Sequence, residues 1–120
     1  MHSRSICPLA NCLDLIGDKW TLILLRDMYL GKARYGDFLT SDESITTNIL
    51  SSRLKDMIKN DLIEKKAYQR KPIRYEYSLK QSGKDLLPVV QSMSKWADKY
   101  IIECRPLPDS FYKLTPSDIP

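Results

Sequence analysis

The segment ITTNILSSRLKDMIKNDLIEKK, residues 45–66, combines three kinds of residue in order along the chain. Small polar side chains begin it, apolar residues follow at helical spacing, and basic residues end it. This spacing predicts an amphipathic helix over residues 47–60. A hydroxyl of Thr46 or Thr47 can cap its first turn, and Asn60 is suited to its end. The recurring apolar residues are Leu50, Leu54, Met57, Ile58 and Leu62.

The polar face of this predicted helix carries more hydroxyl and amide groups than packing alone requires. Helix capping and a solvated surface are the plainest explanation of such residues. A helix that reads the edges of base pairs needs the same groups, because small polar side chains let the backbone approach closely and still form hydrogen bonds. The residues concerned are Thr46, Thr47, Asn48, Ser51, Ser52 and Lys55.

A change to strand spacing follows the helix. Residues 73–79, IRYEYSL, alternate apolar and polar side chains and therefore predict a half-buried strand. Residues 63–68, IEKKAY, form a weaker strand candidate, and the QRKP segment between the two is interpreted as a turn. Together they predict a hairpin with a positively charged tip. The basic residues of this tip are Arg70, Lys71 and Arg74.

The net charge of +4 is concentrated in this hairpin. Residues 63–80 hold six basic and two acidic side chains, whereas the remaining segments are close to neutral. A localised positive charge favours an anionic partner, with nucleic acid the first candidate. A solvated lysine-rich surface is the alternative.

Helices are predicted on both sides of this region. Pro8 and Gly17 bound a first helix, Asp18 and Gly31 bound a second apolar one, and RYGDFLTS favours a short helix. The last long helix follows Gly83, and Pro88 should kink or restart it. Its apolar residues recur at alternating spacings of four and three, as in packed helix pairs. We assign Leu86, Val90, Met93, Trp96, Ala97 and Tyr100 to this contact face.

Residues 105–120 contain four prolines, which predicts an extended or disordered tail, with Phe111 and Tyr112 as possible anchors. We therefore expect a single domain over residues 1–104 and a proline-rich tail over 105–120. The 120-residue length supports one domain with a modest core. No apolar run is long enough for a signal peptide or a membrane span, so we expect a cytoplasmic protein with no membrane partner.

Catalytic, metal and cofactor sites are hard to build from these residues. His2 is the only histidine, and the three cysteines lack the paired spacing of a zinc site. No glycine-rich phosphate loop occurs. Trp20 and Trp96 could line a small-molecule cavity, although large aromatic side chains more often belong to a core, which we favour here. An enzyme is therefore not expected.

The order of the predicted elements favours a winged helix-turn-helix fold. A short helix that turns into a second helix with a polar N-terminal end is typical of helix-turn-helix proteins, which insert the second helix into the major groove. The basic hairpin suits a wing that contacts phosphates or the minor groove. The expected fold class is mainly α with a small β-hairpin, and the expected partner is double-stranded DNA.

The chain resembles the HxlR-type family of bacterial winged-helix transcriptional regulators, which is related to the MarR group. The resemblance covers roughly residues 6–102. It is carried by CP at 7–8, GDKW at 17–20, LSSRLK at 50–55, Pro72, YEYSL at 75–79 and Gly83. It implies a homodimer on a palindromic operator, with terminal helices at the dimer contact. It also implies that Arg53 contacts DNA.

The resemblance further implies that Cys7 could sense oxidants or electrophiles, because free N–H groups at a helix start stabilise a thiolate. An unreactive cysteine at a helix start is the alternative. Two departures from the family pattern stand out. Lys80 replaces a common capping threonine, so Ser82 or water would have to cap the last helix. Asp42 and Glu43 stand in a turn that often contains glycine, and we expect both carboxylates near the DNA face.

These observations together predict a DNA-binding transcriptional regulator, a homodimeric repressor, with a small molecule or oxidant as its possible signal. The alternative is a winged-helix interaction module whose basic face binds an acidic protein, since a fold does not determine a function.

Overall fold

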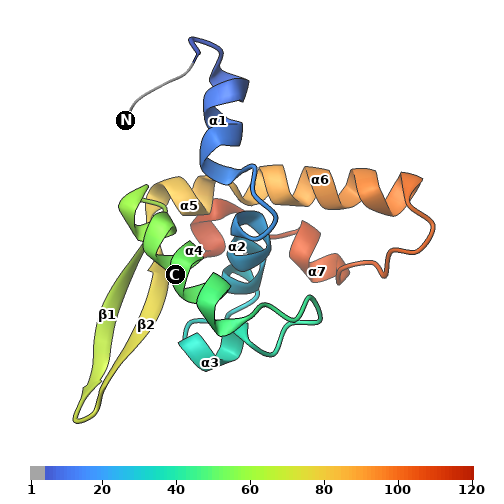
Figure 1. The fold of residues 1–120 in the computed structure, drawn as a ribbon. Helices are drawn as coiled ribbons and strands as arrows, with labels where there is room; N and C mark the ends of the chain where they lie inside the picture. The colour runs from blue at the N-terminus through green and yellow to red at the C-terminus, as the bar shows by residue number, and fades with distance from the viewer. Residues whose placement is uncertain (1–4) are drawn as a thin grey trace.

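The computed structural model describes residues 5–120, so His2 lies outside the described part of the chain. The helices pack against one another, and a two-stranded antiparallel sheet, β1–β2, projects from one end of this helical body (Figure 1). This confirms the expected mainly helical winged helix-turn-helix fold. The elements are α1 (Pro8–Ile16), α2 (Thr21–Tyr29), α3 (Tyr35–Phe38), α4 (Thr47–Lys59), β1 (Ile63–Arg70), β2 (Ile73–Leu79), α5 (Gln81–Asp85), α6 (Leu87–Tyr100), α7 (Asp109–Tyr112) and the 3-10 helix η1 (Pro116–Asp118).

Helix α2 is the central helix of the core. Asp18 precedes it and accepts hydrogen bonds from the backbone N–H groups of Trp20 and Thr21 at 2.9 and 3.0 Å. Burial opposes the charged form of Asp18, but the Thr21 hydroxyl and these N–H groups outweigh it and lower its pKa. Gly31 ends the helical turn with φ at +102°, a conformation that glycine adopts without strain. Both predicted boundary residues of this helix are therefore confirmed.

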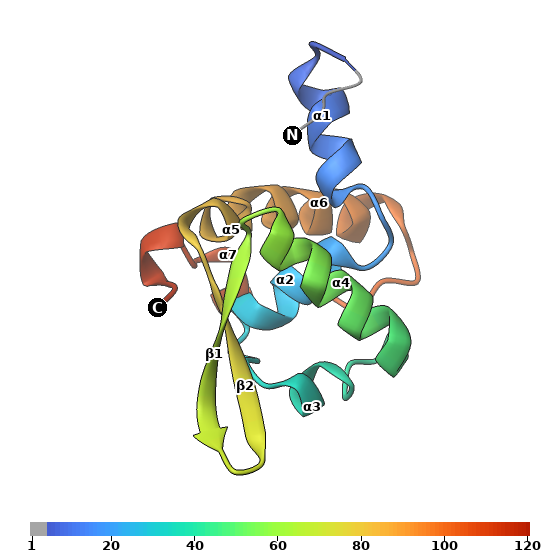
Figure 2. The same cartoon turned by 60° about the vertical axis from the view of Figure 1, so that its left-hand side comes forward.

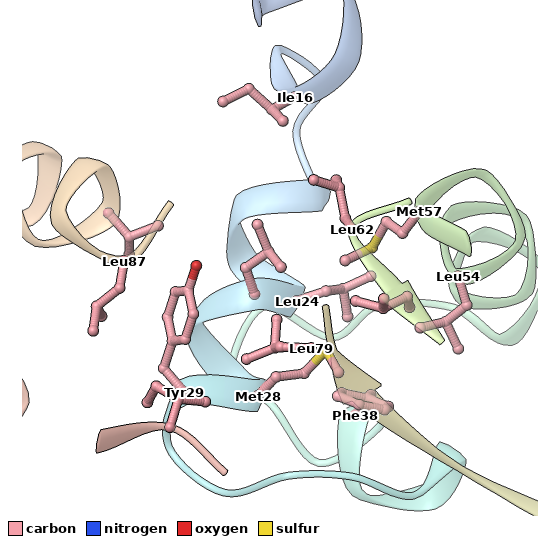
Figure 3. Close-up of a cluster of buried hydrophobic side chains, with 14 of the residues drawn as sticks. Ile16, Leu24, Met28, Tyr29, Phe38, Leu54, Met57, Leu62, Leu79 and Leu87 are labelled. Atoms are coloured by element: carbon pink, nitrogen blue, oxygen red, sulfur yellow. The ribbon is translucent and has the colours of Figure 1, made fainter. Parts of the chain in front are cut away.

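The core forms where α2 meets the inner faces of α3, α4, α5, α6 and the base of the hairpin (Figure 3). Leu25, Phe38, Leu50 and Ile63 come from four different elements and have no exposed surface. Burial of such side chains stabilises the fold by about 1.5–3 kcal/mol each. Trp20 packs partly buried against this cluster, as predicted. Trp96 is 61% exposed, so its predicted core position is wrong, because α6 turns this side chain away from the core.

Helix α1 stands apart from the rest of the molecule in both views (Figures 1 and 2). Cys7 occupies the N-cap position, Pro8 the first helical turn and Gly17 the C-cap, as predicted. Ile16 is the buried residue of this helix. Leu9 and Leu13 are 66% and 52% exposed. An apolar helix face is therefore left without a partner within residues 5–120.

The last long helix is divided at Leu86, which ends α5 and precedes α6, with Pro88 in the first turn of α6. The predicted restart is confirmed. Ser82 does not cap α5, since its hydroxyl instead donates to the carbonyl of Asp61. Gly83 packs so tightly that a Cβ atom there would lie 2.3 Å from the carbonyl oxygen of Leu62. Only glycine allows this approach between α5 and the residue that precedes β1.

The tail differs from the extended chain that its prolines predict. Residues 109–112 form a helical turn after Pro108, and residues 116–118 form a 3-10 turn. Pro116 takes the first position of the 3-10 turn, where proline is favoured. Phe111 is 1% exposed and Ile119 is 8% exposed, so both side chains join the core. The predicted anchoring by Phe111 is confirmed.

Within residues 5–120, no helix combines the length and apolarity that crossing a lipid bilayer demands.

Candidate nucleic-acid interface

Helix α4 presents two different faces. Leu50, Leu54 and Met57 are at most 2% exposed and fix one face to the core. The Thr46 hydroxyl caps the first turn by accepting the N–H of Ile49 at 3.4 Å. Asn60 ends the helix, and Asp61 follows with φ at +60°. The opposite face is exposed to solvent, and it carries Thr46, Thr47, Asn48, Ser51, Ser52 and Lys55.

Tyr35 joins α3 to this exposed face. Its hydroxyl donates to the backbone carbonyl of Thr47 at 3.0 Å and lies 2.9 Å from the Ser51 hydroxyl. The contact positions Ser51 and fixes α3 against the first turn of α4. Sequence reasoning did not assign this role to Tyr35. No local pattern could have revealed it, because the two partners are separated by 12 and 16 residues.

Arg53 does not lie on the open polar face. Its guanidinium donates to Asp56 at 2.5 Å and lies 3.8 Å from Asp18, next to the start of α2. The side chain is 27% exposed. Two carboxylates therefore share its charge within the protein, which ties α4 to α2.

The hairpin follows α4 directly and bends at a register shift between Ala67 and Gln69. The Gln69 side-chain amide donates to the carbonyls of Lys71 and Pro72 at 3.4 and 3.2 Å and so organises the tip. Strand β2 begins at Ile73, as predicted, but Ile73 is 57% exposed, and side chains of this strand become half-buried only from Tyr75 onward. The three basic residues of the tip are all exposed, and these are Arg70, Lys71 and Arg74.

Arg34 links the hairpin to α3. Its guanidinium lies 3.8 Å from the centre of the Tyr68 ring and 3.9 Å from the Glu76 carboxylate. The Tyr77 N–H donates to the carbonyl of Ala33 at 2.7 Å. These contacts hold the hairpin beside α3, and both lie at the end of the molecule away from α1 (Figures 1 and 2). Helix α3, the polar face of α4 and the basic tip therefore form one side of the protein.

The two carboxylates in the turn before α4, Asp42 and Glu43, form ion pairs with arginine side chains. Glu43 accepts two hydrogen bonds from Arg26, at 2.8 and 3.0 Å, and Asp42 accepts one from Arg105 at 2.6 Å. The Arg26 contacts outweigh burial and lower the pKa of Glu43. Both carboxylates are thus paired with cations of the protein. Their expected place near the DNA face stays a prediction. Ser44 has φ at +58° and takes the position where glycine would be unstrained.

The three cysteines are free thiols, with Cys7 and Cys104 exposed and Cys12 half-buried. Among residues 5–120, no group of three His, Cys, Asp or Glu side chains is arranged to hold a metal ion. The interface is thus made of polar and basic side chains on a helical scaffold.

Residues 15–104 match the HxlR-like helix-turn-helix family. The chain belongs to this family. The match spans every element from α2 to α6, including α4 and the hairpin. The HTH-type transcriptional regulator YdeP of Bacillus subtilis is 36% identical over 94 residues, which is 78% of this chain and 73% of YdeP. The regulator sll1512 of Synechocystis is 32% identical over 103 residues, which is 82% of this chain and 76% of the relative.

Solved structures lead to the same conclusion. The redox regulator HypR in its oxidised form superposes with a TM-score of 0.71 at 33% identity, covering 84% of this chain and 100% of HypR. This HxlR-like protein is therefore an HTH-type transcriptional regulator that binds DNA, and it is not an enzyme. The family confirms the function class expected from the polar helix and the basic hairpin.

Proposed function

We propose that this HxlR-like protein is a homodimeric repressor that binds a palindromic operator, with α4 in the major groove and the hairpin on the backbone or in the minor groove. The observation that carries this proposal is the shared orientation of the polar face of α4 and the basic tip. A helix end and a basic tip on one side can contact a groove and its flanking phosphates together.

The two contact regions would have different roles in DNA binding. Thr46, Thr47, Asn48, Ser51 and Ser52 would contact base edges and near phosphates, because amide and hydroxyl groups can pair with bases. Arg70, Lys71 and Arg74 would supply attraction to phosphates, together with Lys55. Arg53 would have a smaller direct share than the family resemblance implies, since Asp56 and Asp18 already bind it.

Dimerisation would cover the apolar surface that the chain leaves open. Met93, Trp96 and Tyr100 are 54%, 61% and 61% exposed on α6, and Leu9 and Leu13 are exposed on α1. Leu86 and Ala97 are half-buried at the edge of this face. Val90, also assigned to the dimer contact from sequence, is 5% exposed and already packs in the core of its own chain. Trp96→Glu should therefore yield monomers in sedimentation experiments, whereas Lys95→Glu, a neighbouring exposed charge change, should not.

Redox control through Cys7 is supported by its exposed thiol at the start of α1 and by the similarity to the redox regulator HypR. A reversible oxidation there could reorient α1 and the dimer. Wild-type protein should release its operator after a mild oxidant, and Cys7→Ser should retain it. Equal release by both proteins would remove Cys7 from the proposal.

A gel-shift scan with fragments of the source genome tests the proposed function. We expect tight binding to a few fragments that contain inverted repeats. Binding without any preferred fragment, even at low salt, would favour the alternative of an interaction module for an acidic protein.

A further inference from the structure

We propose that the pocket between α2, α6 and residues 104–112 binds a small apolar monocarboxylate, whose carboxylate group pairs with Arg105. The pocket has a volume of about 250 Å³. A cavity of about 150 Å³ already accommodates benzene, so this one accepts a single aromatic ring with a short substituent. Its residues are Leu22, Ile23, Arg26, Val90, Met93, Ser94, Ala97, Asp98, Cys104, Arg105, Pro106, Leu107 and Tyr112.

The walls of the pocket are apolar and come from three segments of the chain. Helix α2 contributes Leu22 and Ile23, helix α6 contributes Ala97, and the tail contributes Leu107 and Tyr112. A ligand that buries an apolar body against these walls gains free energy in proportion to the area it removes from water. Sugars and other strongly polar molecules would leave hydrogen-bonding groups unpaired there.

Arg105 is the cation available to a ligand. Arg26 also lines the pocket, but it already donates to Glu43 and Asp27, and these contacts raise its pKa above the ordinary value. Arg105 contacts Asp42 through one nitrogen, and the two side chains are 84% and 78% exposed. Exposed ion pairs of this kind contribute little to stability, so a carboxylate with better geometry can compete with Asp42.

Asp98 limits the ligand to one carboxylate. It lines the same pocket near the end of α6, so a second negative group on the ligand would meet a negative charge. Repulsion in a partly desolvated pocket is stronger than in water. A monocarboxylate oriented toward Arg105 is therefore favoured over a dicarboxylate.

The wall formed by the tail is fixed before any ligand binds. The Gln91 side-chain amide donates to the carbonyls of Phe111 and Leu114, each at 2.9 Å, and the Phe111 side chain is buried. The match to the HxlR-like family ends at residue 104, so Arg105, Leu107 and Tyr112 lie beyond it. The walls from α2 and α6 thus belong to the family match, and the tail wall with its cation lies outside it.

The pocket is connected to α4 through adjacent residues. Arg105 and Arg26 hold Asp42 and Glu43, which lie in the turn that precedes the cap of α4. A ligand whose carboxylate replaces Asp42 as the partner of Arg105 breaks one of these two ion pairs. This regulatory step rests on the proposed function, since it acts through DNA binding by α4, whereas ligand binding itself does not.

Calorimetric titration of the full chain with benzoate, phenylacetate, benzamide and phthalate tests the site. Benzoate and phenylacetate should bind about tenfold more tightly than neutral benzamide, because a hydrogen-bonded charge is worth that factor or more. Phthalate should bind more weakly than benzoate. Arg105→Gln should abolish the preference for the acid, while Lys113→Gln, which removes an exposed tail cation outside the pocket, should leave binding unchanged.

Two occlusion variants from opposite walls, Ile23→Trp and Ala97→Phe, should each reduce binding of both ring compounds. Circular dichroism identifies any variant that fails to fold. If one variant does not fold, ligand binding by the other one tests the site. The site is overturned if no probe binds at millimolar concentration, if both folded occlusion variants bind normally, or if Arg105→Gln retains the preference for benzoate over benzamide.

Operator binding with and without benzoate tests the coupling separately. Benzoate should lower the DNA affinity of the wild type several-fold and leave Arg105→Gln unaffected, and Asp42→Asn should resemble the liganded wild type. Benzoate binding without a change in DNA affinity would overturn the coupling and keep the site. Benzoate binding by a protein that binds no DNA would overturn the proposed function and the coupling together.

Discussion

Helix α4 and the hairpin lie on the same side of the protein, but they differ in how much of their surface is buried. Three leucine and methionine side chains bury one face of α4 almost completely, so the polar face is held in a fixed orientation. The hairpin is exposed along most of its length beyond Ile63, and its outer half carries the charge of the tip. Residues 45–62, which include α4, hold three basic and two acidic side chains, whereas residues 63–80 hold six basic and two acidic ones.

This difference indicates how the two regions would contribute to binding. Reading base edges needs hydrogen-bonding groups at fixed positions, which a helix packed on a core provides. Attraction to phosphates acts over about 8–10 Å at ordinary salt and needs no exact geometry, so a projecting hairpin suffices. Sequence preference should therefore depend on α4, and the salt dependence of affinity on the hairpin.

The largest effect is expected from removing the charge of the hairpin tip. An Arg70/Lys71/Arg74 triple alanine variant should bind every DNA sequence more weakly, and its salt dependence should be less steep by about one unit for each lost phosphate contact. Fluorescence anisotropy at several salt concentrations measures both quantities. A Lys95/Lys99/Lys113 triple alanine variant removes the same charge from α6 and the tail and should change little. Equal behaviour of the two variants would refute the role of the tip.

A smaller but sequence-dependent effect is expected on α4. Asn48→Ala should weaken binding to the preferred operator by about 1–3 kcal/mol and should leave binding to unrelated DNA nearly unchanged. Ser51→Ala should alter the preference in the same manner. Competition assays with operator and random DNA measure the ratio of the two affinities. An equal loss of affinity for operator and random DNA would indicate that these residues contact phosphates rather than base edges.

Tyr35→Phe should weaken the support of α4 by α3. It removes the hydroxyl that bonds the Thr47 carbonyl and contacts Ser51, and such a hydrogen bond contributes about 1 kcal/mol. Urea unfolding measures the change in stability, and the operator assay measures any loss of preference. Tyr68→Phe, the same chemical change on the hairpin, is the control. A larger effect from Tyr68→Phe would contradict the role of Tyr35.

Ser44→Gly should produce the smallest effect and increase stability. Ser44 adopts φ of +58° in the turn before α4, and glycine occupies this region without strain at a gain of about 1 kcal/mol. Ser44→Ala keeps the Cβ atom and should give no such gain. Thermal unfolding compares the two variants, and equal melting temperatures would show that this turn is not strained.

The sequence by itself determined the elements and their class. Helical spacing predicted α4 within one residue of its observed end, strand spacing predicted the hairpin, and capping residues predicted the bounds of α1 and α2. These signals are local, because each depends on neighbouring residues along the chain. The charge count likewise located the basic tip, since its residues are consecutive.

Only the tertiary structure decided what the side chains contact. The family resemblance implied that Arg53 contacts DNA, and the structure shows its guanidinium beside Asp56 and beside Asp18, which is 35 positions earlier in the chain. Glu43 and Asp42, which were expected near the DNA face, form ion pairs with Arg26 and Arg105. The prolines of the tail predicted an extended chain, but the tail forms short helical turns, and Phe111 and Ile119 are buried in the core. The ion pairs of Arg53 with Asp18, of Arg26 with Glu43 and of Arg105 with Asp42 join residues that are distant in sequence. They depend on how the helices pack, so a local pattern does not show them.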